Sequence, residues 1–113
     1  MGAIAFSEEP EHSWVMAGWV LRQVLDDTAS QHPEDFQMAE KFDIAKAMDG
    51  LIVYLLPDEF ATRVTKAIRE AAQGILSGTI QSGIVDKPDC DVRTLNEYFD
   101  ALRELLAAIP MSR

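Results

Sequence analysis

Apolar residues recur at helical spacing along most of the chain, and this pattern predicts helices joined by short connections. The clearest example begins at Pro57, Asp58 and Glu59, a proline followed by two acids that suit the first turn of a helix. Gly78 suits the position just after the last turn. Between them one face is apolar and is made of Phe60, Val64, Ala67, Ile68, Ala71, Ile75 and Leu76.

A last helix is expected between residues 92 and 109, where apolar residues step by three and four as in a heptad seam. The seam consists of Val92, Leu95, Phe99, Leu102, Leu106 and Ile109. Asp91 is the expected N-cap, with Asp89 as the alternative, and Pro110 ends the helix. Because fewer than three heptads make an isolated coiled coil marginal, we expect the seam to pack inside the molecule rather than to form a dimer.

A first helix is expected over residues 13–30. Its first two turns are apolar nearly all round, so either they are buried on several sides or Val15 and Trp19 face a partner. Asp26 and Asp27 lie near its C-terminal end, where the helix dipole disfavours acids. Such misplaced acids point only weakly to function, because a salt bridge to another element explains them equally well.

A second helix is expected to begin at Pro33, with Glu34 and Asp35 in its first turn. Gly50 interrupts its pattern, and residues 51–56 are rich in strand formers. Carrying the helix through Gly50 costs about 1 kcal/mol relative to alanine, which burial can offset, so we expect helix here. The alternative is a turn at Asp49 and Gly50 followed by a short buried strand at 51–56, paired with residues 79–85.

Together these patterns predict an all-α fold, an antiparallel bundle of about four helices, with the short strand at 51–56 as a minor alternative. The 113 residues fit a single domain, residues 1–113, large enough to bury a core without disulfides or metals.

The charge of the chain is unevenly distributed. Residues 1–61 hold 12 acidic and 3 basic residues, whereas residues 62–113 hold seven of each, so the whole net charge of −9 lies in the first half. Such a field repels phosphate backbones, so we expect no direct binding of nucleic acid. It would attract a basic protein and speed its encounter, although the plainer alternative is a solvated surface that keeps the protein soluble.

The potential metal ligands are sparse. Glu9 and His12 have the Glu-x-x-His spacing of di-iron bundles, but it occurs once and beside Pro10, and His32 has no such companion. Cys90 lies between two aspartates that disfavour a thiolate, so we assign it no role. These observations predict no metal site and no cofactor.

No catalytic motif is present either. The serines occur in no nucleophile elbow, the glycines form no phosphate loop, and no calcium-loop spacing appears. Arg63, Lys66 and Arg69 form a basic patch that is solvated, binds an anion, or pairs with acids of the first half. The sequence therefore predicts a protein that is not an enzyme.

The first six residues lack the basic region and the long apolar run of a signal peptide, and no apolar run approaches the ~20 residues that span a bilayer. We therefore expect a cytoplasmic protein that does not bind membranes.

The predicted function is that of a small acidic protein-binding domain, an inhibitor of the immunity or antitoxin type that neutralises a basic partner such as a toxin or nuclease domain. It shares small size and acidity with bacterial immunity proteins but no motif with them. Trp19, Phe36 and Tyr54 are candidate anchors. The candidate contact acids are Asp26, Asp27, Glu34, Asp35, Glu40, Asp43, Asp58 and Glu59.

Two alternatives stay open. The first is a homo-oligomeric helical protein with a structural or regulatory role, held by the first or the last helix, so the chain is either a monomer or a homodimer. The second is a bundle that binds a small molecule or a metal, with Met16, Met38 and Met48 lining an apolar pocket.

Overall fold

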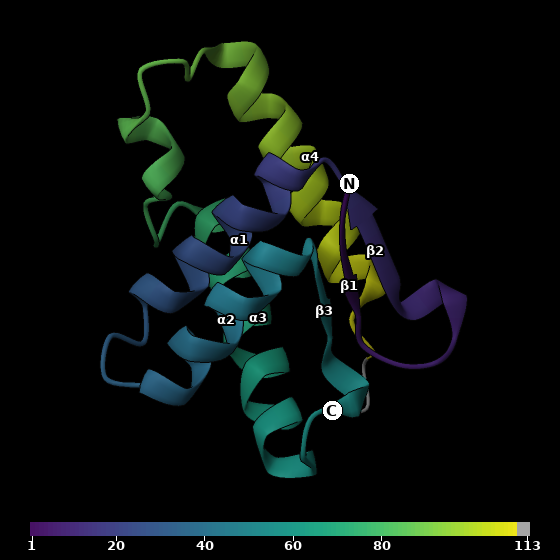
Figure 1. The fold of residues 1–113 in the computed structure, drawn as a ribbon. Helices are drawn as coiled ribbons and strands as arrows, with labels where there is room; N and C mark the ends of the chain where they lie inside the picture. The colour runs from purple at the N-terminus through teal and green to yellow at the C-terminus, as the bar shows by residue number, and fades with distance from the viewer. Residues whose placement is uncertain (111–113) are drawn as a thin grey trace.

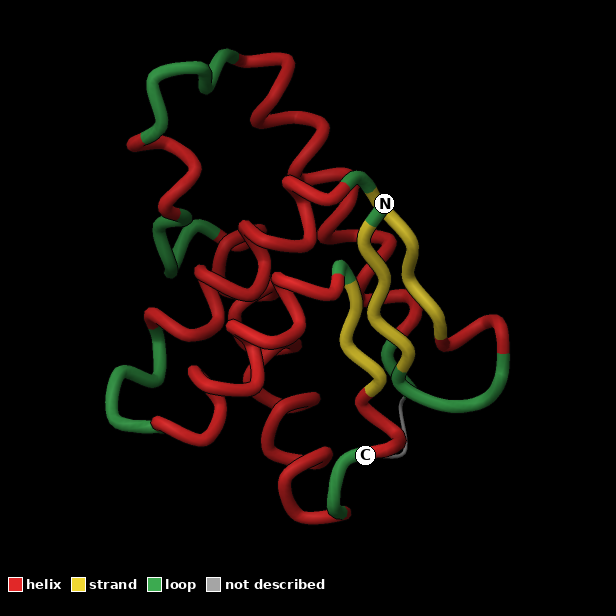
Figure 2. The backbone as a smooth tube through the Cα atoms, viewed as in Figure 1, coloured by secondary structure: helices red, strands yellow, loops and turns green. Residues whose placement is uncertain are grey.

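The computed structural model describes residues 1–110 and shows a three-stranded sheet packed against helices (Figure 1, Figure 2). The strands are β1 (Gly2–Ala5), β2 (Ser13–Met16) and β3 (Gly50–Ile52). The helices are α1 (Gly18–Ser30), α2 (Phe36–Met48), α3 (Asp58–Ser77) and α4 (Val92–Ala108). Three short 3-10 turns are η1 (Pro10–His12), η2 (Val53–Leu55) and η3 (Gly83–Asp86).

The fold is therefore α+β, and the prediction of an all-α helical bundle is wrong. The order of the strands is β2-β1-β3, with β1 antiparallel to β2 and parallel to β3. The last three residues, which the sequence analysis included in the domain, lie outside the described residues.

The predicted first helix begins five residues later than expected, because its first turn is a strand. In β2 the side chain of Trp14 is buried and that of Val15 is exposed, since successive residues of a strand point to opposite faces. On β1, Ile4 lies opposite Trp14 and is fully buried. The all-round apolar character of residues 14–20 thus records a strand followed by a helix, not a helix buried on every side.

Helix does not continue through Gly50. α2 ends where Asp49 adopts a left-handed conformation (φ 55°), and the chain turns directly into β3. Leu51 pairs with Ile4 of β1, so the partner of this strand is β1 and not residues 79–85. The strand that was the minor alternative is present, but only over Gly50–Ile52, and η2 follows it.

The two strongest helix predictions are confirmed. α3 spans Asp58–Ser77 and ends at Gly78, whose φ of 83° suits glycine. α4 begins after Asp91, whose carboxylate accepts a hydrogen bond from the Thr94 N–H at 2.8 Å. Leu102 and Ile109 of the heptad seam are buried, and Leu95, Phe99 and Leu106 pack against the core, so the seam packs inside the molecule except at Val92, which is 76% exposed.

The core lies between the sheet and the helices. α4 packs on α3 and on β2, and the Trp14 Nε1 donates a hydrogen bond to the Ala101 carbonyl of α4 at 3.0 Å. Figure 1 shows the sheet on one side of the molecule, with α1 and α2 beside it and α4 behind it. Within residues 1–110, no helix has both the length and the apolar character needed to cross a membrane.

Candidate functional site

Asp26 and Asp43 share one cation. The Lys46 Nζ lies 2.8 Å from the Asp26 Oδ1 and 3.3 Å from the Asp43 Oδ1. The hydrogen bond to Asp26 raises the pKa of Lys46 above its ordinary value. The misplaced acid at the end of α1 is thus explained by a salt bridge to α2, and much of its charge is already compensated.

Asp27, the neighbouring acid, is not on the surface. Its side chain is 4% exposed, and its carboxylate accepts four hydrogen bonds. Tyr98 Oη and Ser82 Oγ donate to Oδ2 at 2.6 and 2.5 Å, and Gln23 Nε2 and the Gly83 N–H donate to Oδ1, both at 2.9 Å. Asp27 therefore holds η3 and α4 against α1, and it is inaccessible to a partner.

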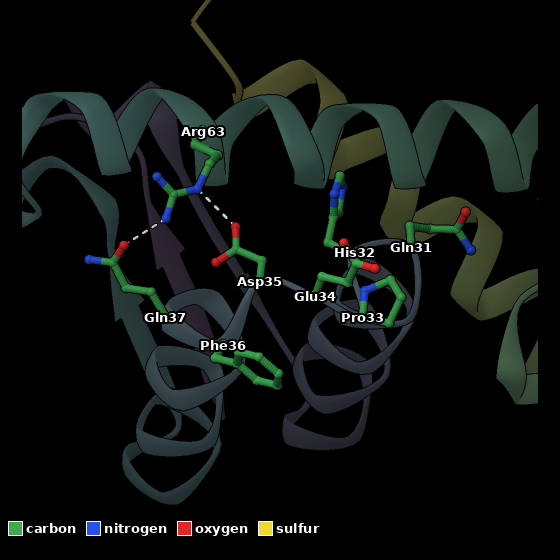
Figure 3. A pocket seen from close by; sticks show the side chains of 8 residues that line it. All are labelled: Gln31, His32, Pro33, Glu34, Asp35, Phe36, Gln37 and Arg63. Atoms are coloured by element: carbon green, nitrogen blue, oxygen red, sulfur yellow. Dashed lines mark hydrogen bonds and ion pairs between the residues drawn. The ribbon is translucent and has the colours of Figure 1, made fainter.

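Asp35 has two structural contacts. Its Oδ1 accepts from the Met38 N–H at 3.0 Å and caps α2, so the helix begins later than the expected start at Pro33. Its Oδ2 accepts from the Arg63 Nε at 2.8 Å, and a second guanidinium nitrogen of Arg63 donates to Gln37. Figure 3 shows Arg63 reaching from α3 to meet both side chains. One residue of the predicted basic patch thus pairs with an acid of the first half.

A hollow of about 710 Å³ surrounds this group, where the turn between α1 and α2 meets α3. Glu34, His32 and Phe36 line it together with the Asp35–Arg63 pair (Figure 3). The hollow is wide open to solvent, whereas a small-molecule site usually buries most of its ligand. Its shape suits the surface of a macromolecule better than a small ligand.

The hollow continues along α2. It shares Gln37 with a neighbouring hollow of about 320 Å³, which in turn shares Lys41, Ile44 and Leu56 with a third of about 210 Å³. We call this continuous depression the α2 groove. One wall is a single stripe of α2 made of Gln37, Glu40, Lys41, Ile44, Ala45 and Met48.

The opposite wall of the α2 groove comes from the end of β3, from η2 and from the start of α3. Leu55, Leu56 and Pro57 form its middle, with Ile52 on one side and Phe60 on the other. Five of the exposed large apolar side chains of the described residues gather along the groove: Phe36, Ile44, Met48, Ile52 and Leu55. Met48 is 75% exposed and Leu55 69%, which leaves a contiguous apolar face uncovered.

The rim of the α2 groove is acidic. Glu34 and Glu40 line it, and Asp58 and Glu59 follow directly after Pro57. These four carboxylates are exposed and form no ion pair with any of residues 1–110. Two basic residues line the groove, Lys41 and Arg63, and Arg63 is already paired with Asp35. The acidic residues of the groove and its rim therefore outnumber the bases, and an excess of negative charge remains.

Three of the predicted contact residues, Glu34, Phe36 and Glu40, line the α2 groove, and the predicted contacts Asp58 and Glu59 directly follow Pro57 of its opposite wall. Ile44, Ile52 and Leu55 were not predicted as contacts, and Met48 was predicted as the lining of an apolar pocket in one of the two alternatives. The available signal was the excess of apolar residues on α2, of which Met38, Phe42 and Ala45 are the ones buried on its core side.

The other candidate anchors lie elsewhere. Trp19 is half-exposed, and its ring centroid lies 6.4 Å from that of Tyr98. Tyr54 is half-buried in η2.

One group of potential metal ligands occurs within residues 1–110. Glu9, Glu11 and His12 offer ligand atoms within 4.8 Å of one another at the tip of the β1–β2 hairpin. Both glutamates are exposed, and the His12 Nδ1 lies 2.7 Å from the Ser7 Oγ in a hydrogen bond. The absence of a metal site stays a prediction.

Comparisons with known proteins add no relative: no family model matches the chain, and neither does any curated protein or solved structure.

The Asp35 carboxylate predicts a dependence of stability on pH. Its hydrogen bond from Met38, followed by that from Arg63, lowers the pKa of Asp35 below its ordinary value of 3.8. A carboxyl whose folded-state pKa is depressed stabilises the fold above the unfolded value, and the effect is lost as pH falls through the folded value. We expect Asp35→Ala to lower the free energy of unfolding by about 1 kcal/mol at neutral pH.

This deficit is expected to shrink as urea unfolding is repeated at pH values from about 4 downward, where the carboxyl of the unfolded chain becomes protonated first and that of the folded protein follows at lower pH. Asp43→Ala is the matched control, because Asp43 is 76% exposed and caps no helix. A deficit of Asp35→Ala that stayed the same at low pH would show that the charge of Asp35 does not carry the effect.

Proposed function

We propose that this chain is a protein-binding domain that holds an apolar segment of a basic partner protein in the α2 groove. The observation that carries the proposal is the contiguous apolar face of Ile44, Met48, Ile52 and Leu55 inside an acidic rim. Apolar anchors supply most of the binding energy at protein interfaces, and complementary charge at the rim sets the encounter rate and the choice of partner.

The shape of the groove favours a helical segment. α2 has 13 residues and therefore forms a wall about 20 Å long. An amphipathic helix of similar length would place apolar side chains at helical spacing against Ile44, Met48 and Leu55. Lysine or arginine on its flanks would then face Glu34 and Glu40 on one side, while Asp58 and Glu59, next to Pro57 of the opposite wall, add negative charge on the other.

The proposal extends to an inhibitor of the immunity or antitoxin type that acts in the cytoplasm. A basic enzyme that binds an anionic substrate has a cationic cleft, and an acidic protein seated beside that cleft would oppose substrate binding. The support is the net charge of −9 together with the exposed apolar anchors of the α2 groove.

The test compares two substitutions of apolar residues that are almost equally exposed. Met48 is 75% exposed in the groove, and Val92 is 76% exposed at the start of α4, away from it. We expect Met48→Asp to weaken binding of a captured basic partner by at least about tenfold and Val92→Asp to leave it unchanged. Partners are first captured from a cell lysate and identified, and the purified partner is then titrated by calorimetry.

Charge reversal supplies the second arm. Reversing Glu40 and Glu59 should lower the association rate, and the difference from wild type should shrink as salt rises. If the partner is an enzyme, wild type should inhibit it and Met48→Asp should not. Equal weakening by Met48→Asp and Val92→Asp would contradict the proposal, and so would concentration-dependent self-association through Met48 without any partner.

A further inference from the structure

A second depression lies at the opposite edge of the sheet from the α2 groove. Two hollows of about 290 and 390 Å³ run between β2 and α4, and they join because both are lined by Met16 and Glu104. We call this depression the β2 groove. Figure 2 shows β2 as an outer strand of the sheet.

On this edge the Ser13 N–H donates to the Pro10 carbonyl, and the backbone groups of Val15 have no hydrogen-bond partner among residues 1–110. Phe6 donates its N–H to the His12 carbonyl at 2.9 Å, while Ala3 donates to the Asp49 carbonyl at 3.2 Å, on the other side of β1. Bonded and non-bonded pairs alternate along an antiparallel ladder, so Ile4 and Trp14 exchange hydrogen bonds, whereas Ala3 and Val15 do not. The N–H and C=O of Val15 therefore point away from β1, toward the open edge of the sheet.

The walls of the β2 groove carry acids without bases. The two hollows are lined by Glu11, Glu97, Asp100 and Glu104, and by no lysine or arginine of the described residues. Asp100 pairs with Arg103 at 2.7 Å and Glu97 with Arg93 at 3.5 Å. Glu11 and Glu104 form no ion pair with any of residues 1–110, so the groove keeps a net negative charge.

We propose that the β2 groove binds an extended segment of a partner protein that pairs with the β2 edge and carries lysine or arginine at alternate positions. This site is separate from the α2 groove and does not depend on it. An unpaired edge strand is a ready template for an added strand, and backbone hydrogen bonds to Val15 would supply the pairing.

The alternation of the bases follows from the pleat of the sheet. Trp14 points toward α4, where its Nε1 donates to the Ala101 carbonyl. Residues of an added strand directly opposite Trp14 and Met16 would point the same way, toward Asp100 and Glu104, and those between them would point to the other face. Trp19, half-exposed at one end of the groove, offers an aromatic face to one of the cations.

The experiment uses two synthetic peptides of about eight residues with the same composition of lysine and threonine. In one peptide the residues alternate, and in the other the lysines form one block, so the two differ in pattern and not in charge. We expect the full chain to bind the alternating peptide at least about tenfold more tightly in fluorescence anisotropy.

Variants separate the two parts of the site. Glu104→Lys should weaken binding of the alternating peptide by at least about tenfold. Asp86→Lys makes the same charge change at an exposed residue of η3 and should have little effect on this binding. Val15→Pro removes the outward N–H and should abolish the preference for the alternating peptide. Val15→Thr keeps the N–H and should retain the preference, and thermal unfolding confirms that each variant is folded.

Equal affinity of wild type for the two peptides would overturn the proposal, and so would a preference that survives both Glu104→Lys and Val15→Pro. A dimer that Val15→Pro dissociates, without any binding of peptide, would also overturn it, because the edge would then be occupied by a second copy of the chain. Met48→Asp should leave peptide binding unchanged, so failure of this site is distinguishable from failure of the α2 groove.

Discussion

Asp27→Ala is expected to lower the free energy of unfolding by about 3 kcal/mol or more. The substitution leaves the hydroxyls of Tyr98 and Ser82, the amide of Gln23 and the N–H of Gly83 without their shared acceptor. A buried donor left without a partner costs roughly 1–3 kcal/mol, and contributions within one network are not additive. Urea unfolding of wild type and variant measures the difference.

Asp26→Ala is the matched control, one residue away on the same helix. Its carboxylate is 52% exposed, and its ion pair with Lys46 is a surface pair, which is worth about 0–1 kcal/mol. Asp27→Asn should fall between the two, because the asparagine oxygen can still accept from Gly83 and Gln23 while the hydroxyls rotate to accept. Equal effects of Asp26→Ala and Asp27→Ala would show that the buried network does not hold the fold together.

A local measurement accompanies the global one. The Asp27 carboxylate ties η3 and α4 to α1, and burial, followed by the charge of Asp27, raises the pKa of Tyr98 well above its ordinary value. Tyr98 therefore remains a neutral donor throughout the physiological range. Loss of the acceptor should speed hydrogen exchange at the Gly83 amide more than at amides in the middle of α3.

The helices α3 and α4 could be predicted because their signals are local. The structure confirms the predicted start of α3 at Pro57 and Asp58, its end at Gly78, and the start of α4 after Asp91. An apolar stripe runs along each of these two helices. A residue at a helix end acts on backbone groups within one turn, so sequence alone contains the information.

The sheet could not be predicted because its pairing is not local. β1 is four residues long with Ile4 as its one large apolar side chain, and β3 is three residues long. β1 bridges two strands that lie on opposite sides of α1 and α2 in the sequence, and neither β2 nor β3 has a periodicity long enough to reveal it. Short apolar runs are ambiguous between strand and helix, and tertiary pairing decides between them.

The candidate site was predicted in part for the same reason. The sequence shows that α2 carries apolar residues on more than one side, among them Phe36, Ile44 and Met48. It does not show which of these sides is buried by the rest of the chain and which is left exposed. Asp26 and Asp27 are identical side chains at adjacent positions, and only the distant partners of Asp27 distinguish the buried carboxylate from the exposed one.

Trp14→Ala is expected to lower the free energy of unfolding by about 3–5 kcal/mol, the range for removing a buried aromatic side chain. Trp14 is 2% exposed, and it joins the sheet to α4 both by packing and by its hydrogen bond to the Ala101 carbonyl. The substitution leaves a cavity between β2 and α4 and removes the hydrogen bond that the Ala101 carbonyl accepts in addition to the one within its own helix. Urea unfolding followed by circular dichroism measures the loss without depending on tryptophan fluorescence.

Trp19→Ala is the matched control, since it removes the same side chain from a position that is 38% exposed. It should cost about 1 kcal/mol, because part of the ring already faces water and its main aromatic neighbour is Tyr98. Trp14→Phe should fall between them, since it keeps most of the packing and loses the indole N–H. If Trp19→Ala destabilised the protein as much as Trp14→Ala, the docking of β2 on α4 would not be the contact that joins the sheet to the helices.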